Sequence, residues 1–99
     1  MTREEVIERL RPHEAELRQA GVEALYLFGS TARNQASRTS DVDLACDIDD
    51  SRNLSLLDFI EVQQEIGRLL RRRRVDLVER KCLRPRVKTL VEQDMVRVF

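Results

Sequence analysis

The strongest constraint in this 99-residue sequence is a glycine-serine pair followed, after ten intervening residues, by two aspartates one residue apart. Gly29 and Ser30 directly follow the strand-like run of residues 22–28, and Asp41 and Asp43 lie at the start of the next such run. Aspartate is depleted in strands, and neighbouring carboxylates repel each other. The arrangement therefore indicates a site at which a ligand compensates the repulsion.

The glycine-serine turn has the chemistry of a phosphate site. Gly29 allows the backbone to bend sharply and to approach a ligand closely. We expect Ser30 to start a short helix, where its hydroxyl and the following N–H groups can hold an anion. The turn is not a P-loop, because no Lys-Ser/Thr follows a second glycine. Taken alone, the pair is also compatible with an ordinary turn and helix cap.

The aspartates have the chemistry of a magnesium site. Alternate residues of a strand share a face, so Asp41 and Asp43 are expected to point the same way at about 7 Å Cα spacing. Magnesium takes carboxylate oxygens together with substrate phosphates. Asp76, in the later run "RVDLV", completes a cluster of three carboxylates if its strand pairs with that of Asp43. Asp47 is a weaker candidate for the third ligand. Taken alone, these acids are also compatible with a solvated strand face.

The order of the elements predicts an α/β or α+β fold in a single domain of residues 1–99. Apolar residues recur at helical spacing in some segments and at alternate positions in others. Helices are expected over residues 2–20, 54–70 and 84–94, and strands over 22–28, 41–48, 74–78 and 95–99. This pattern leaves open whether the sheet is parallel or mixed.

Charge and targeting signals exclude some functions. Eighteen Lys and Arg balance eighteen Asp and Glu, which gives no argument for nucleic-acid or membrane binding. No apolar run approaches the roughly 20 residues of a membrane span, and the N-terminus has no signal-peptide pattern. We therefore expect a cytoplasmic protein. The basic run of residues 71–74 fits a solvated helix end, or alternatively a contact with phosphate or an acidic partner.

The cysteines and the histidine suggest no second site. Cys46 and Cys82 lack a CxxC spacing, and His13 forms no metal-ligand pattern with them. Cys46 lies in an apolar alternation, so we expect a buried, reduced thiol.

The motifs "LFGSTAR", "SDVDL", "VDLV" and "LRPRV" together resemble the DNA polymerase β-type nucleotidyltransferase superfamily. Within it, essentially the whole chain resembles the minimal nucleotidyltransferases. The resemblance implies a small mixed sheet of about four strands with helices packed on one face. It assigns nucleotide phosphates to Gly29 and Ser30, with Arg33 either on phosphate or in a structural pair, and magnesium to the catalytic acids Asp41, Asp43 and Asp76. Asp76, as the third carboxylate, would also help to activate the attacking hydroxyl.

Two positions depart from the family pattern. Members often carry a basic residue directly after Gly-Ser and a glycine after the arginine, where this chain has Thr31 and Asn34. The departure concerns phosphate affinity and the shape of the turn, and leaves the metal site intact.

The resemblance implies transfer of AMP from ATP, with two magnesium ions, to a hydroxyl group. A single small core presents a groove and cannot enclose an acceptor, so the hydroxyl is expected on a macromolecule or between two subunits. The resemblance implies an antitoxin that adenylylates a HEPN ribonuclease toxin. Two alternatives remain open: a non-catalytic antitoxin that covers its toxin, and an enzyme that modifies a small molecule of the aminoglycoside type. No direct nucleic-acid or membrane binding is expected, and homo-oligomerisation is left open.

Overall fold

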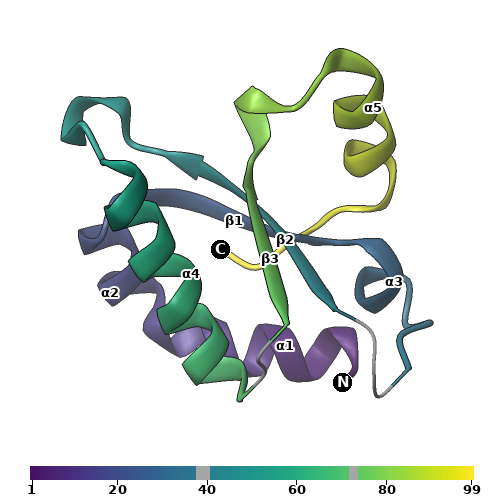
Figure 1. The fold of residues 1–99 in the computed structure, drawn as a ribbon. Helices are drawn as coiled ribbons and strands as arrows, with labels where there is room; N and C mark the ends of the chain where they lie inside the picture. Colours follow the sequence, from purple (N-terminus) through teal and green to yellow (C-terminus); the bar gives the residue numbers. More distant parts are fainter. Residues whose placement is uncertain (38–40, 72–73) are drawn as a thin grey trace.

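Four strands form one mixed sheet in the order β3-β2-β1-β4 (Figure 1). The computed structural model describes residues 1–37, 41–71 and 74–99. The strands are β1 (Val22–Phe28), β2 (Val42–Ile48), β3 (Val75–Glu79) and β4 (Val96–Arg97). β1 pairs antiparallel with β2 and with β4, whereas β2 and β3 run parallel. The implied small mixed sheet of four strands is therefore confirmed.

The helices lie close to their expected positions. They are α1 (Arg3–Leu10), α2 (Glu14–Gln19), α3 (Gly29–Ala32), α4 (Leu56–Leu70) and α5 (Pro85–Asp94), with short 3-10 turns at Arg11–His13, Asp50–Arg52 and Arg80–Cys82. The helix expected over residues 2–20 is interrupted by the first of these turns. Pro12 accounts for the break, because proline lacks the N–H that continues the ladder.

The main core lies between one face of the sheet and helices α1, α2 and α4 (Figure 1). The alternation expected in the second strand is present: Val42, Leu44 and Cys46 are buried in this core. Cys46 is a free thiol, as expected. Burial raises the pKa of Cys46 to about 12, so it stays protonated at neutral pH.

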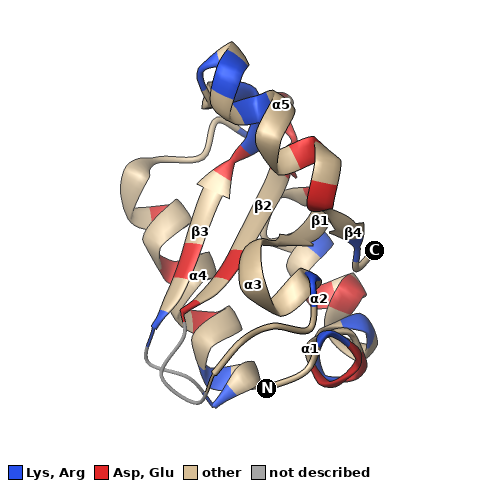
Figure 2. Cartoon of the chain, turned by 90° about the vertical axis from the view of Figure 1, so that its right-hand side faces the viewer, with Lys and Arg blue, Asp and Glu red and all other residues tan. Residues whose placement is uncertain are grey.

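Helix α5 lies on the opposite face of the sheet, where Val91 packs with Tyr26 and Ala45 in a second, smaller cluster. Helices α1, α2 and α4 on one face agree with the expected arrangement, whereas α5 covers part of the other face. Beyond α5 this second face is open, and the acidic segments of β2 and β3 lie side by side there (Figure 2).

The basic run expected at residues 71–74 lies only partly within the described residues. Arg71 ends α4 in a left-handed conformation and Arg74 precedes β3, whereas Arg72 and Arg73 lie outside the described residues. In the described part of the chain, no helix combines the length and apolar character needed to span a bilayer.

Candidate functional site

Asp43 and Asp76 are neighbours on adjacent parallel strands. They are register partners in the β2–β3 ladder, and adjacent strands lie about 4.8 Å apart. Their chain neighbours Val42, Leu44, Val75 and Leu77 are buried in the main core, so the two carboxylates project from the other face. Asp43 is half-buried and Asp76 is exposed. The strand pairing on which the role of Asp76 depends is therefore present.

Asp41 adds a third negative charge to this place. It is exposed and directly precedes β2. Burial raises the pKa of Asp43, and the negative charges of Asp76 and Asp41 raise it further. The three acids are thus close enough to repel one another, and a cation bound between them would relieve that repulsion.

Gly29 brings the backbone of the glycine-serine turn directly against Asp43. Its φ of +75° lies in the left-handed region, and a Cβ added there would lie 2.6 Å from Oδ2 of Asp43. Phe28, the preceding residue, is the register partner of Asp43 in the β1–β2 ladder. Only glycine satisfies both the backbone angle and the close contact. A ligand group held by this turn would therefore lie beside the carboxylates.

Ser30 occupies a slightly different position from the one expected. Helix α3 begins at Gly29, so Ser30 is its second residue rather than its first. The side chain of Ser30 is half-buried, and its hydroxyl forms no hydrogen bond with the described residues. The hydroxyl is therefore available to a ligand at the turn.

Arg33 is held by a partner within the molecule. Its Nη1 lies 2.9 Å from Oδ2 of Asp94 at the end of α5, and its Nε donates to Oε1 of Gln35. The ion pair joins α3 to α5, which favours the structural one of the two roles expected for Arg33. A contact between Arg33 and nucleotide phosphate stays a prediction.

Asp47, the weaker candidate for the third ligand, is occupied by other groups. Arg80 donates to both of its oxygens, at 2.9 and 2.8 Å, and the hydroxyl of Tyr26 donates to Oδ2 at 3.3 Å. The guanidinium of Arg80 also lies 4.8 Å from the centre of the Tyr26 ring. This cluster could not be predicted from sequence, since no local pattern links residues 33 positions apart.

The acids fit a magnesium site that substrate completes, rather than a closed protein cage. Within residues 1–37, 41–71 and 74–99, no three His, Cys, Asp or Glu side chains already form a group that could hold a metal ion. Magnesium at nucleotide sites commonly uses one or two carboxylates and takes its other ligands from phosphates and water. Asp43 with its two acidic neighbours, beside a turn that can accept phosphate, meets that requirement.

Comparison with known proteins identifies relatives that span nearly the whole chain. A family model described as "Polymerase beta, Nucleotidyltransferase" matches residues 13–98. Protein adenylyltransferase MntA of Thermococcus cleftensis is 37% identical over 99 residues, covering 99% of this chain and 97% of the relative. A protein of Methanocaldococcus jannaschii, provisionally named protein adenylyltransferase MJ0126, is 36% identical and covers 98% of both chains.

Solved structures share the fold. A protein provisionally described as a minimal nucleotidyltransferase superposes with a TM-score of 0.81 and 28% identity, covering 97% of this chain and 95% of the other. A complex of the tri-AMPylated Shewanella oneidensis HEPN toxin with its MNT antitoxin contains a chain with a TM-score of 0.65 and 21% identity, covering 94% of this chain and 71% of that one.

Proposed function

Since this chain belongs to the polymerase beta nucleotidyltransferase family, we propose that it transfers AMP from ATP to a hydroxyl group of a protein partner. Two relatives at 36 and 37% identity carry the name protein adenylyltransferase, which supports a protein as the acceptor. The observation that carries the proposal is the contact of Gly29 with Asp43 beside Asp76, which brings a phosphate-compatible turn and paired acids together.

In this proposal the site residues divide into two groups. Gly29 and the hydroxyl of Ser30 bind the triphosphate. Asp41 and Asp43, with Asp76, would hold two magnesium ions. Bound magnesium would supply neutralisation of the phosphate charge and would lower the pKa of an acceptor hydroxyl. Arg33 would contact phosphate only after its ion pair with Asp94 breaks.

The chemical step is a displacement at the α-phosphorus. The acceptor oxygen forms a bond to that phosphorus, the bond to the bridging oxygen breaks, and pyrophosphate leaves with the electron pair. Asp76 is exposed next to Asp43, and there it can orient the acceptor hydroxyl and take up its proton. Most of the rate enhancement is then positioning and charge stabilisation.

The proposed partner is a HEPN-domain toxin, which makes this chain an antitoxin. The support is the resemblance of the sequence to minimal nucleotidyltransferases and the shared fold of the antitoxin bound to the Shewanella oneidensis toxin. The exposed positions of Asp41 and Asp76 also agree with an acceptor that approaches from outside the domain.

The test is transfer of label from α-³²P-ATP, with magnesium, to a co-expressed HEPN toxin. Wild type should label the toxin and neutralise it, and the double variant Asp41→Asn/Asp43→Asn should do neither. Asp50→Asn, an exposed acid outside the site, is the matched control and should behave as wild type.

Two results would contradict the proposal. Full neutralisation by the double variant without label would establish an antitoxin that acts by complex formation. Labelling of an aminoglycoside by this chain alone, with no label on the toxin, would establish a small-molecule enzyme.

A further inference from the structure

Strand β3 lies at the edge of the sheet, and in the described part of the chain it pairs with β2 alone. In Figure 1 it lies in front of the other strands. The N–H of Val42 donates to the carbonyl of Arg74 at 3.0 Å. Since alternate residues of a parallel ladder bond to the neighbouring strand, Val75, Leu77 and Glu79 turn their N–H and C=O groups away from β2.

The side chain of Gln63 supports this orientation. Its Nε2 donates to the carbonyl of Val75 at 2.9 Å, so that carbonyl points toward α4 and is already occupied. Further along β3, the N–H and C=O of Leu77 and the N–H of Glu79 have no hydrogen-bond partner among the described residues. Unpaired groups on a strand edge can bond to another strand. The unoccupied part of the edge is therefore the segment from Leu77 to Glu79.

A pocket of about 590 Å³ lies beside this segment. It is lined by Leu77, Val78 and Glu79 of β3 and by Leu56 and Phe59 of α4. Leu77 packs in the main core and Val78 in the cluster on the opposite face, so residues from both faces of the sheet border the pocket. Leu56 is 75% exposed. An apolar side chain placed beside the edge would cover Leu56 and lose its own contact with water.

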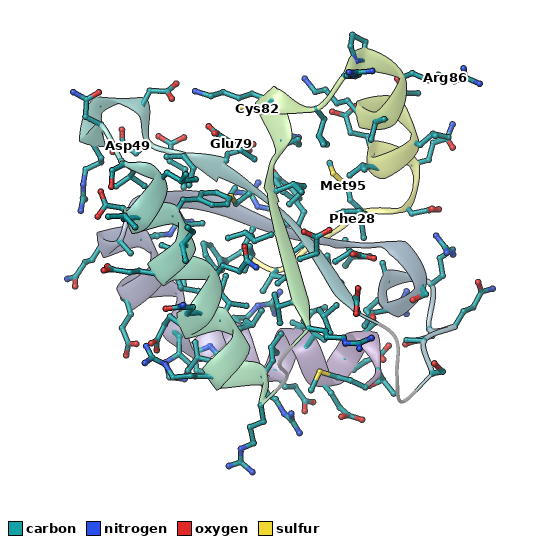
Figure 3. All side chains as sticks on the ribbon, in the orientation of Figure 1. Phe28, Asp49, Glu79, Cys82, Arg86 and Met95 are labelled. Carbon is teal, nitrogen blue, oxygen red and sulfur yellow. The ribbon has the colours of Figure 1, made fainter. Side chains whose placement is uncertain are left out.

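The end of the pocket farthest from the carboxylates is acidic. Asp49, Asp50 and Glu79 line it together with one cation, Lys81. Lys81 is paired with Asp50 and Glu79, whereas Asp49 forms no ion pair with a described residue. In Figure 3 the labelled side chains of Asp49 and Glu79 mark the ends of β2 and β3. A basic side chain of a partner would complement Asp49.

We propose that an extended segment of the acceptor protein docks here as a fifth strand of the sheet, bonded to Leu77 and Glu79. The docking rests on the proposed transfer to a protein. Added strands gain affinity from main-chain hydrogen bonds and specificity from pockets for alternate side chains. Since paired residues share a face, the residue opposite Leu77 faces the apolar pocket. A basic residue two positions away, opposite Glu79, approaches Asp49.

The same placement brings an acceptor hydroxyl to the acids. Asp76 directly precedes Leu77, and its carboxylate shares a face with that of Asp43. The residue opposite Asp76 in the added strand projects from this face too, and adjacent strands lie about 4.8 Å apart. A hydroxyl at this position lies beside Asp76, which is proposed to take up its proton. The segment recognised would carry a hydroxyl residue, an apolar residue next to it and a basic residue two positions further.

The test compares Glu79→Pro with Glu79→Ala in binding to unmodified HEPN toxin, measured by calorimetry without nucleotide. Glu79 has a φ of −85°, close to the angle that proline imposes, and its N–H points away from β2, so proline removes one outward donor and spares the ladder. Both variants lose the carboxylate. Glu79→Pro should bind the toxin roughly tenfold more weakly than Glu79→Ala, because one main-chain hydrogen bond is lost.

Leu56→Asp tests the pocket without touching the strand. The side chain is 75% exposed, so the fold should be retained, and the new charge should weaken toxin binding by about tenfold or more because it enters an apolar contact. Val87→Asp, the same kind of change at an exposed residue of α5, is the matched control and should bind the toxin as wild type does. Melting temperatures check that every variant is folded.

Three results would overturn the docking: no toxin binding by wild type, equal binding by Glu79→Pro and Glu79→Ala, or wild-type binding by Leu56→Asp. A dimer of this chain alone that Glu79→Pro abolishes would show that a second copy occupies the edge, and would overturn it as well. Asp41→Asn/Asp43→Asn should still bind the toxin but leave it unlabelled. Binding and labelling are separate readouts, so failure of the docking is distinguishable from failure of the transfer.

Discussion

At the scale of single residues, the contact between Gly29 and Asp43 explains how a turn and a strand become one site. The turn approaches so closely that no side chain fits between its backbone and the carboxylate. The same closeness half-buries Asp43, which contributes to its raised pKa. The ionised form of Asp43 is therefore unfavourable in the free protein, and a bound cation would relieve this cost.

Gly29→Ala should destabilise the protein by roughly 1–3 kcal/mol, because the left-handed backbone and the Asp43 contact both oppose a Cβ. The measurement is the melting temperature, combined in a double-mutant cycle with Asp43→Ala. In the Asp43→Ala background, Gly29→Ala should cost less stability, since only the left-handed backbone angle then opposes the added Cβ. A purely additive cycle would show that the close contact contributes nothing.

Asp43→Asn should raise the melting temperature at neutral pH while it lowers transfer activity by more than about 100-fold. The pKa of Asp43 is raised in the folded protein, so the folded state binds more protons than the unfolded state as this group titrates. Stability therefore falls as pH rises through that window, and above it the full penalty remains. Asparagine removes the penalty. A variant that melts below wild type at pH 7 would contradict the assignment.

Asn34 shows how the sequence accommodates its departure from the family pattern. The residue has a φ of +56°, the left-handed conformation that a glycine adopts easily and asparagine tolerates better than most residues. Its Oδ1 accepts a hydrogen bond from the backbone N–H of Arg3 at 2.9 Å. The turn after α3 thus keeps its backbone angle without glycine and gains a link to the start of α1.

At the scale of elements, α5 packs on the sheet through Val91 and carries an ion pair at its end. The Arg33–Asp94 ion pair joins the end of α5 to α3, the helix that follows the glycine-serine turn. Both side chains are about two-fifths exposed, so the pair contributes little to stability.

Asp94→Asn and Arg33→Gln separate the two roles of Arg33. Both should lower stability by about 1 kcal/mol or less, since each breaks the same exposed pair. If Arg33 also binds phosphate, Arg33→Gln alone should raise the KM for ATP several-fold, whereas Asp94→Asn should leave it unchanged or lower it. Equal KM values for both variants would make Arg33 a structural residue only. Steady-state kinetics at saturating acceptor measures the difference.

At the scale of the whole molecule, one small core carries an open site, so ligand binding should be visible in global stability. Magnesium and ATP together, at about 100 times the dissociation constant, should stabilise the folded state by about 2.7 kcal/mol. In Asp41→Asn/Asp43→Asn the shift should vanish, and ATP with EDTA should give little shift in wild type. Differential scanning calorimetry tests this, and an equal shift without magnesium would rule out a metal-dependent site.

The sequence by itself determined the local features of this protein. Alternation in β2 assigned Val42 and Leu44 to the core and Asp43 to the opposite face, because successive side chains of a strand point to opposite sides. Ser55 and Asp58 are three positions apart and form a reciprocal cap at the start of α4. These features depend on stereochemistry and on hydrogen bonds between residues a few positions apart, so they can be predicted from the sequence.

Tertiary structure alone decided which distant residues meet. The parallel pairing that sets Asp76 beside Asp43, the Arg80–Asp47 bridge and the Arg33–Asp94 bond all join residues more than 30 positions apart. No local pattern fixes the register between two strands or the face on which α5 packs, because both follow from burying the apolar surface of the whole chain at once. Sequence therefore indicated which acids could form the site, and only packing brought them against Gly29.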